Sequence, residues 1–398
     1  MTPALAYLES LQGSGIRPGL GRIRAILRRL GRPERAYRSI IVAGTNGKGS
    51  TSAMLSSILV ASGYRTGLYT SPHLVDIRER WMIGGSMIDD DLLEVSVGEL
   101  RAAAGAAGIN PTYFEAMTLI AFIAFRRAAC EVAVLEVGMG GRLDATNVVR
   151  PIAAVITPIG FDHMEYLGDT LGKIAAEKAG VIHRGAIALT TNDDARIVDV
   201  LRRRAAHVGA PLEIVTGEHD TPLSGPFQRR NAALAVRTAE ALASVLPRIT
   251  APSIERGVVS TRWRGRLECI RLRGKQIWVD GCHNGHAIAV IAPFIERSLP
   301  RPRALVFGIM ADKDVEAVGG ALFPLFDRVI TTEPFPPRSA AADGLAQLAG
   351  RLGVEATPEP NPEEAFARAM AGPENTVFIG GSLYLAGSAI AYFDSHSQ

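Results

Sequence analysis

The fold is decided by the stretch Ile40-Ile-Val-Ala-Gly-Thr-Asn-Gly-Lys-Gly-Ser-Thr51, in which an apolar run leads into a glycine-rich turn and then into hydroxyl residues. This pattern predicts a strand, a loop and the first turn of a helix. Backbone N–H groups of such a turn, together with the helix N-terminus, form a nest that binds phosphate. We expect Lys48 to reach the β- and γ-phosphates of a nucleotide, and Ser50 or Thr51 to offer a hydroxyl to Mg²⁺.

The turn departs from the strict GxxxxGK[ST] pattern, because position 42 is Val42 and Gly49 follows the lysine. An ordinary tight turn between a strand and a helix is therefore the alternative interpretation. The scarcity of lysine argues against it, since only five of the 43 basic residues are lysines and the rest are arginines. In such a chain, a lysine in this turn indicates a need for a compact primary amine.

The chain is long enough for two domains, because single cores stop growing at roughly 250–300 residues and this sequence has 398, of which 47% are hydrophobic. Short β-branched runs alternate with helical stretches, as in parallel sheets with crossover helices. A Pro-containing stretch and an arginine-rich turn between Pro247 and Arg266 indicate a boundary. We expect an α/β fold with an N-terminal phosphate-loop domain over residues 1–262, built on a mostly parallel sheet, and a smaller domain over residues 263–398.

The expected elements follow from these runs. Strands are expected at Ser39–Ala43, Thr66–Thr70, Val132–Val137, Ile152–Thr157, Gln276–Val279, Ala304–Phe307, Arg328–Thr331 and Thr376–Ile379. Helices are expected at Gly49–Ser62, Thr112–Arg127, Thr170–Val181, Ala195–Val208, Arg229–Leu246 and Asn284–Arg297. The second of these helices is apolar nearly all round, as is typical of a helix buried in a layered domain.

Composition argues against several classes of protein. A net charge of +3 gives no support to a nucleic-acid or membrane-surface partner. Cys130, Cys269 and Cys282 lie far apart, so neither a disulfide framework nor a structural zinc site is expected. The longest apolar run, Phe114–Phe125, is too short to span a bilayer, and the N-terminus does not resemble a signal peptide. We expect a cytoplasmic protein.

Polar side chains follow other predicted strands. Glu136 closes an apolar run before a glycine-rich stretch, where a carboxylate either binds Mg²⁺ or serves as a satisfied structural group. His163 follows the next strand, and a lone histidine is more often structural than a ligand. Ser71 lies in a loop after a strand and is a weaker candidate hydroxyl ligand. Because Lys48, Glu136 and His163 all come at or after C-terminal strand ends, where open parallel sheets bind ligands, we favour a shared site.

Lys178 presents a different problem, because it shares the apolar face of the predicted helix Thr170–Val181. Burying an unpaired ammonium is costly, so a buried Lys178 is expected to be paired, neutral or chemically modified. The alternative is a snorkelling lysine near a helix end capped by Gly180. From the residues alone, snorkelling is the favoured interpretation. Lys173 and Lys275 are interpreted as surface residues.

In the C-terminal domain, the sequence Trp278-Val-Asp-Gly-Cys-His-Asn284 repeats the strand-end pattern. Asp280, His283 and Asn284 are candidates to hold a nucleotide ribose or a small amino-acid substrate. A helix cap explains one of these residues but not the cluster.

Taken together and in this order, the motifs resemble the folylpolyglutamate synthase/dihydrofolate synthase family of Mur-type ATP-dependent amide ligases. The stretches that carry the resemblance span nearly the whole chain: Gly19-Leu20, Ala43–Thr51, Ser71–Leu74, Arg78–Arg80, Thr112–Glu115, Glu136–Asn147, Asp162-His163, Leu167-Gly168, Glu177–Gly180, Gln228, Asn231, Gly265–Glu268, Asp280–Asn284 and Gly380–Tyr384. Three departures are Gly21 in place of an acidic residue, Cys282 in place of the more usual alanine, and Gly285 where proline is common. None removes a group that the chemistry requires.

The resemblance implies a mononucleotide-binding N-terminal domain, a Rossmann-like C-terminal domain, and roles for named residues. It implies phosphate binding by Asn46, Gly47, Lys48 and Gly49, and Mg²⁺ ligation by Ser50, Ser71, Glu136 and His163. It implies an N-carbamylated Lys178 that supports a second Mg²⁺. ATP contacts are implied at Asn231, Arg266 and Asp280, and contact with the incoming glutamate or nearby nucleotide at His283. Pterin contacts are implied at Gly19, Leu20, Thr112, Tyr113, Phe114, Glu115, Leu143, Asp144 and Ala145.

The implied activity joins L-glutamate to dihydropteroate, and further glutamates to tetrahydrofolate, through an acyl phosphate made from ATP. We expect a monomer that uses ATP, Mg²⁺, folates and L-glutamate and has no nucleic-acid or membrane partner. A single-activity folylpolyglutamate synthase is an alternative. A cell-wall Mur ligase is less suited, because it typically carries GKT and a UDP-binding domain for which the chain has no room. A kinase or nucleotide-dependent switch leaves Lys178 and the Asp280–Asn284 cluster unexplained.

Overall fold

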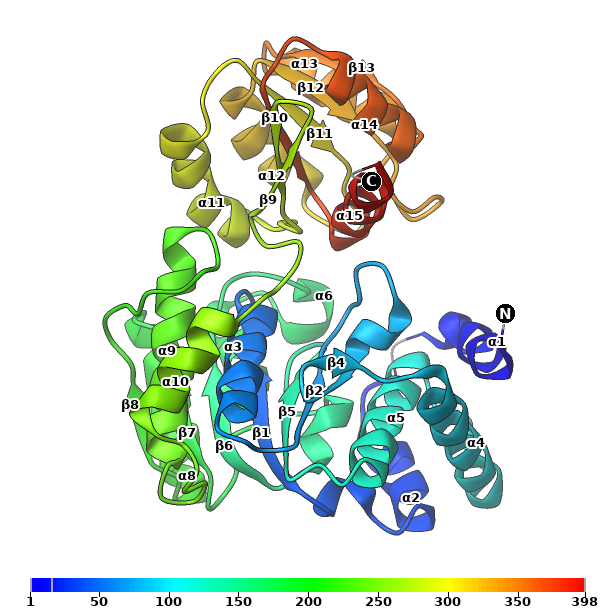
Figure 1. The fold of residues 1–398 in the computed structure, drawn as a ribbon, viewed down its shortest axis with the longest axis vertical. Coiled ribbons are helices and arrows are strands. Elements are labelled where there is room, and N and C mark those ends of the chain that lie inside the picture. The colour runs from blue at the N-terminus through cyan, green and yellow to red at the C-terminus, as the bar shows by residue number, and fades with distance from the viewer. Residues whose placement is uncertain (1, 16, 397–398) are drawn as a thin grey trace. The chain divides into compact units, whose positions relative to one another are not determined.

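The computed structural model describes residues 2–15 and 17–396 and divides into two compact units, each with its own sheet (Figure 1). The first unit takes in the described part of Met1–Pro72, together with Arg78–Pro222 and Arg229–Thr261. The second takes in His73–Ile77, Leu223–Gln228 and the described part of Arg262–Gln398. Two short segments thus belong to the second unit although they lie far before Arg262, which the sequence pattern did not indicate.

Within the described residues, the first unit is built around an eight-stranded sheet in the order β4-β3-β2-β5-β1-β6-β7-β8. The strands are β1 (Arg38–Ala43), β2 (Thr66–Tyr69), β3 (Trp81–Ile83), β4 (Ser86–Met87), β5 (Val132–Glu136), β6 (Pro151–Ile156), β7 (Ile187–Thr190) and β8 (Leu212–Ile214). Pairing is parallel from β2 through to β8, and β3 and β4 add an antiparallel hairpin. The prediction of a mostly parallel sheet is confirmed.

The helices of this unit connect and cover the strands. They are α1 (Pro3–Ser10), α2 (Gly21–Arg29), α3 (Lys48–Ala61), α4 (Asp90–Ala107), α5 (Tyr113–Arg127), α6 (Met164–Leu167), α7 (Leu171–Ala179), α8 (Ala195–Val208), α10 (Ala251–Ser260) and most of α9 (Pro226–Leu242). Helix α5 is buried along its whole length from Glu115 to Phe125, as its all-round apolar sequence predicts.

The order of the strands in the sheet determines where the candidate site lies. Strands β1 and β6 are neighbours, yet the chain leaves β1 through α3 toward β2 and leaves β6 through α7 toward β7, on the opposite side. The loops after the two strands therefore diverge, and the crevice at such a switch point is where open α/β sheets bind ligands. The ends of β5 and β2 lie next along the same edge.

The second unit is built on a six-stranded sheet in the order β13-β12-β11-β14-β10-β9, counted over the residues described there. Its strands are β9 (Glu268–Leu272), β10 (Lys275–Val279), β11 (Arg303–Phe307), β12 (Arg328–Thr331), β13 (Glu355–Pro358) and β14 (Thr376–Gly380). Its helices are α11 (Gly285–Ser298), α12 (Val315–Leu322), α13 (Ala342–Arg351), α14 (Pro362–Ala371) and α15 (Leu383–His396). Pairing is parallel except that β9 runs antiparallel to β10.

Alternate residues of the central strand β14 point to opposite faces of this sheet. Phe378 joins an apolar cluster with α11, α12 and α13, whereas Val377 and Ile379 join another with α14 and α15. Helices on both faces of a mostly parallel sheet are the Rossmann-like arrangement that the sequence resemblance implied.

Several elements differ from the prediction. The strands β3, β4, β7, β8, β9 and β13, and nine of the fifteen α-helices in the described residues, were not predicted, because they are short or lack a clear period. The helix expected over Arg229–Leu246 instead covers Pro226–Leu242, beginning at a proline that suits a first helical position. Lys275, interpreted as a surface residue, is partly exposed, and its Nζ donates to the carbonyl oxygen of Gly372 at 2.7 Å and also to that of Glu374. No helix among the described residues is long and apolar enough to cross a membrane.

Helices α3 and α10 lie along each other and make an unusually close backbone contact (Figure 1). A Cβ placed on Gly257 would lie 2.3 Å from the Cα of Ile58 and 2.7 Å from its backbone nitrogen. The hydroxyl of Ser57 donates to the carbonyl oxygen of Gly257 at 2.6 Å, which fixes the helix spacing. Because α3 begins at the glycine-rich turn, this contact helps to hold the turn.

Gly257→Ala is expected to lower the free energy of unfolding by about 1–3 kcal/mol, since the added methyl group pushes the two backbones apart. The matched control is Gly98→Ala in α4, where an added Cβ meets nothing within 4 Å. That change is expected to raise stability by about 0.5–1 kcal/mol through helix propensity. Denaturant unfolding followed by circular dichroism measures both, and equal stability of the two variants would contradict this account of the contact.

Candidate active site

The turn after β1 is a tight loop built around two glycines in the left-handed region. Gly44 has φ of +146°, and a Cβ there would lie 1.9 Å from the hydroxyl oxygen of Thr157. Gly47 has φ of +86° and is the residue preceding α3, so it brings no side chain to cap the helix N-terminus. Lys48 opens α3 and folds back, donating from Nζ to the carbonyl oxygens of Gly44 at 3.2 Å and Thr45 at 2.9 Å. The backbone amides of the loop, the N-terminus of α3 and the ammonium group of Lys48 therefore lie close together.

Asn231 of α9 lies against this loop. A Cβ on Gly47 would come within 2.6 Å of the Asn231 side-chain oxygen, and Asn231 is buried. The structure therefore brings together the phosphate-loop residues and one predicted ATP contact that is far away in sequence.

The loops after β1 and β6 are joined by Thr45 and Gly160. The Thr45 hydroxyl donates to the carbonyl oxygen of Gly160 at 3.0 Å and accepts from its N–H at 3.1 Å, and the Thr45 N–H donates to Pro158. Asn192, which follows β7, accepts from the N–H of Ile159 at 2.8 Å and donates to Thr157. Sequence reasoning missed Thr45 and Asn192, although each polar side chain comes two residues after the end of a strand.

Two of the predicted metal ligands meet at the ends of β5 and β2. The buried carboxylate of Glu136 accepts a hydrogen bond from the backbone N–H of Ser71 at 3.2 Å. Glu136 is also the register partner of Val42, two residues before Gly44, while Ser50 lies buried in the first turn of α3. Carboxylate and hydroxyl oxygens are the ligands that Mg²⁺ prefers, so this donor set fits the ion.

No three His, Cys, Asp or Glu side chains in the described ranges gather into a ready-made metal cluster. The predicted set contains only two such side chains, Glu136 and His163, and its other members are hydroxyls. Metal binding by these residues therefore stays a prediction.

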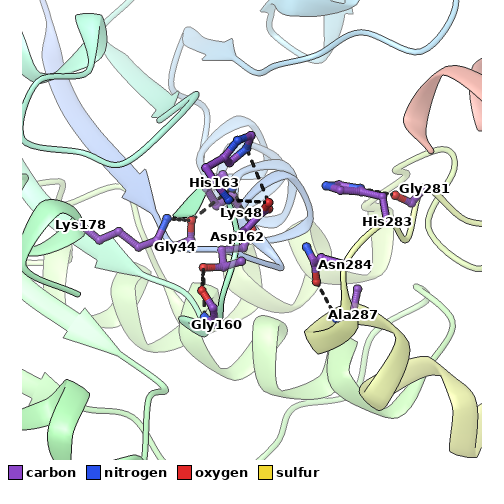
Figure 2. A network of polar contacts seen from close by, with 11 residues as sticks. Gly44, Lys48, Gly160, Asp162, His163, Lys178, Gly281, His283, Asn284 and Ala287 are labelled. Atoms are coloured by element: carbon purple, nitrogen blue, oxygen red, sulfur yellow. Dashed lines mark hydrogen bonds and ion pairs between the residues drawn. The ribbon is translucent and has the colours of Figure 1, made fainter. Parts of the chain in front are cut away.

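His163 has a left-handed backbone, with φ of +49°, which is uncommon for a residue with a side chain. Its N–H donates to the carboxylate of Asp162 at 2.9 Å, and its ring Nε2 lies 3.9 Å from the same oxygen. Such conformations are costly and cluster at functional sites. Dashed lines in Figure 2 join His163 to the carboxylate of Asp162.

Lys178 is buried, and its Nζ donates to the carbonyl oxygen of Gly44 at 2.6 Å (Figure 2). Burial and then the charge of Lys48 lower the pKa of the Lys178 ammonium from 10.5 to about 7. Near neutral pH a substantial fraction of the amine is therefore unprotonated, although lysines are normally cationic.

The snorkelling interpretation of Lys178 was wrong, because the glycine-rich loop covers the end of α7. A Cβ on Gly180 would lie 2.5 Å from the Cα of Arg142, and one on Gly141 would lie 2.8 Å from the carbonyl oxygen of Glu177. Lys178 is buried beneath this cover, and its amine points toward the loop after β1. Lys173, by contrast, is exposed and pairs with Asp169, as expected of a surface residue.

Several residues predicted to contact the pterin use their side chains for hydrogen bonds within the protein. Thr112 and Glu115 form the capping box of α5, with Glu115 accepting from the Thr112 N–H at 2.8 Å and Thr112 from the Glu115 N–H at 3.3 Å. Arg22 donates to Glu115 at 3.2 Å, which ties the start of α2, just after Gly19 and Leu20, to the start of α5.

The other predicted pterin residues surround the glycine-rich loop. Buried Asp144 accepts from the N–H groups of Gly138 and Met139, and burial raises the pKa of its carboxyl group. A Cβ on Gly138 would lie 2.4 Å from the ring of Phe114. Tyr113, Phe114 and Leu143 keep exposed surface, whereas Ala145 is buried. Side chains able to contact a flat ring system are therefore those of Phe114, Tyr113 and Leu143.

In the second unit, the residues after β10 form a cluster of their own. Buried Asp280 accepts from the N–H groups of Leu267 and Cys282, both at 2.8 Å, and burial raises the pKa of its carboxyl group although Arg266 opposes the shift. His283 uses Nδ1 to contact the carbonyl oxygen of Gly281 at 2.7 Å (Figure 2).

Asn284 caps α11, accepting from the Ala287 N–H at 2.8 Å (Figure 2). The helix-cap interpretation is therefore right for Asn284.

Family models match both units. The Mur ligase middle domain matches residues 42–221, and the Mur ligase, glutamate ligase domain matches residues 265–383. The chain is 32% identical to the dihydrofolate synthase/folylpolyglutamate synthase of Bacillus subtilis, over 96% of each chain. It is 35% identical to a probable bifunctional folylpolyglutamate synthase/dihydropteroate synthase of Haloferax volcanii over 97% of its own length, but spans about half of that longer protein.

Solved structures agree with these matches. The folylpolyglutamate synthase of Mycobacterium tuberculosis, complexed with ADP and AMPPCP, superposes with a TM-score of 0.90 at 31% identity, covering 98% of both chains. The bifunctional folylpolyglutamate synthase/dihydrofolate synthase of Yersinia pestis, complexed with AMPPNP and an Mn ion, superposes with a TM-score of 0.86 at 30% identity, covering 99% of this chain and 98% of that one. The chain belongs to the folylpolyglutamate synthase/dihydrofolate synthase family of Mur-type ligases.

Proposed function

We propose that this protein is an ATP-dependent ligase that joins L-glutamate to dihydropteroate and extends tetrahydrofolate with further glutamates. The observation that carries the proposal is the buried Lys178 amine hydrogen-bonded to the phosphate loop at Gly44, in a chain of this family. A kinase or switch has no evident use for a second lysine in that position. The family membership and the absence of a GKT sequence weigh against a cell-wall Mur ligase, and a single-activity folylpolyglutamate synthase remains the alternative.

The reaction begins by activating a carboxylate, which is a poor acylating agent. The folate carboxylate attacks the γ-phosphorus of ATP and gives an acyl phosphate and ADP. The loop residues Asn46, Gly47 and Gly49, with Lys48, would stabilise the negative charge on the transferring phosphoryl group. Asn231 would contact the nucleotide from the side of Gly47. The glutamate amine then displaces phosphate, forming the amide.

Divalent metal is part of this proposal, held by Ser50, Ser71, Glu136 and His163. When bound, Mg²⁺ neutralises charge on the phosphate oxygens. The left-handed backbone of His163 places its ring next to the Asp162 carboxylate, which would orient the ring toward the ion.

Lys178 would support a second ion after carbamylation. Its neutral amine attacks CO₂, forming an N–C bond and releasing one proton, so that an uncharged side chain becomes an anion. A pKa of about 7 makes this step favourable near neutral pH, because only the unprotonated amine is nucleophilic. The product places a carboxylate close to Lys48, where the bare ammonium was disfavoured by like charge.

The two parts of the chain would divide the work. Residues 1–262 would bind ATP and, through Gly19, Leu20, Tyr113, Phe114 and Leu143, the pterin, while Thr112, Glu115, Asp144 and Ala145 shape that site. Residues 263–398 would contribute glutamate-ligase residues, with Arg266 and Asp280 contacting ATP and His283 near the incoming glutamate. We expect a monomer.

Purified protein with MgATP is expected to release phosphate only when both dihydropteroate and L-glutamate are present, since the acyl phosphate forms on the acceptor and is consumed by the amine. A coupled phosphate assay measures this, with tetrahydrofolate as a second acceptor to distinguish one activity from two. Turnover of ATP at the same rate without glutamate would refute the ligase assignment and favour a kinase.

Lys178→Ala is expected to lower kcat by on the order of 100-fold or more, the cost typical of losing one group that stabilises transition-state charge. Short carboxylates should restore part of the activity by occupying the vacated space. Lys178→Arg, which keeps a cation but cannot form this carbamate, should be as inactive as the alanine variant. Wild-type activity should fall below about pH 7, where the amine is protonated. Full activity of either variant would rule out the carbamate role.

A further inference from the structure

A cavity of about 680 Å³, open to solvent, lies on the first unit between α7, α8 and the glycine-rich loop. Its volume falls within the roughly 300–1,000 Å³ typical of small-molecule sites. Four cationic side chains line it, Arg142, Lys173, Arg203 and Arg204, together with apolar residues that include Ala176 and Val200. None of the lining residues is acidic. The residues used to bind ATP, metal and pterin above do not include them.

Three of these cations are paired only with carboxylates on the rim. Arg142 meets Glu177 at 2.8 Å, and Lys173 and Arg203 meet aspartates one helical turn away, at 2.8 Å and 3.0 Å. All three cationic side chains are more than half exposed. Exposed pairs of this kind contribute little to stability, so an anionic ligand can replace the rim carboxylates at small cost.

The fourth cation, Arg204, has no carboxylate within 4.0 Å among the described residues. Its Nη2 donates to the carbonyl oxygen of Ile182 at 3.0 Å, and its Nε is buried without a hydrogen-bond partner. Burial lowers the pKa of the neighbouring His183, and the charges of Arg204 and Arg24 lower it further. Of the four cations at the cavity, Arg204 is therefore the one that no carboxylate pairs within the described residues.

A lining of cationic and apolar side chains suits a flexible chain that carries both methylene groups and regularly spaced carboxylates. We infer that this cavity binds an oligo-γ-glutamate chain, whose units each bring one carboxylate and two methylene groups. The choice of this ligand rests on the proposed ligase function, which makes such chains the product. The chain is recognised either free or as the tail of a folate.

One wall of the cavity is formed by the end of α7, the helix that contains Lys178. Gly180 and Arg142 line it, and the side-chain amide of Asn147 donates to the carbonyl oxygen of Arg142 at 3.1 Å and to that of Gly180 at 3.2 Å. A chain bound there contacts the end of α7 only two residues beyond Lys178. The product would thereby fix the segment that holds the lysine in place.

Isothermal titration of the full chain with tri-γ-glutamate tests the inference. Wild type should bind, and Arg203→Gln and Arg204→Gln should each weaken Kd by roughly tenfold or more, the usual worth of a charged hydrogen bond. Arg202→Gln is the matched control, because Arg202 is exposed on the same helix and does not line the cavity. Exposed Arg203 can be replaced with little effect on folding, which thermal unfolding checks. Raising the salt concentration should weaken binding.

No binding to wild type, or the same Kd in all four proteins, would overturn the inference, and the latter would indicate binding at another site. Binding of tripolyphosphate without binding of tri-γ-glutamate would overturn the assignment to a carboxylate chain. Titration does not require turnover, so binding can be measured even if the protein proves inactive as a ligase. Such inactivity would refute the proposed function without deciding whether this cavity binds the chain.

Discussion

Burial of the Lys178 amine against the carbonyl oxygen of Gly44 is the constraint on which the candidate site depends. An ammonium away from water must lose its proton, find a partner or be modified. Here the partner is the backbone carbonyl oxygen of Gly44 in the loop after β1. Lys48 donates to the same oxygen, so two lysine amines lie at one short turn. Their mutual repulsion adds to desolvation and brings the pKa of Lys178 to about 7. The same contact ties α7 to the end of β1.

The rest of the first unit holds this contact in place. Parallel pairing of β2, β5, β1 and β6 brings four strand ends to one edge, where Ser71, Glu136, the glycine loop and His163 emerge. Glycines then allow approaches that no other residue permits, at Gly47 against Asn231 and at Gly180 against Arg142. The oxygen-rich donor set and the phosphate loop are thus consequences of strand order.

Much of this was predictable from the sequence, because polar residues after apolar strands converge in any parallel sheet. Glu136 and Lys48 were found in that way, and the apolar α5 was recognised by its composition. Lys178 was misread, since helical periodicity shows which face is apolar but not that Gly141 and Gly180 bring a loop over the helix end. Thr45 and Asn192 went unnoticed because their role is to hydrogen-bond neighbouring loops, which only pairing of β1, β6 and β7 reveals.

The central claim is that Lys178 carries a neutral amine poised for carbamylation, and ¹³C NMR of protein equilibrated with ¹³C-bicarbonate tests it most directly. The account predicts a carbamate resonance near neutral pH that is absent from Lys178→Ala, whereas a resonance from the N-terminal α-amine, whose pKa is ordinarily about 8, would be common to both proteins. A wild-type spectrum without a carbamate resonance, or one unchanged by the substitution, would contradict it.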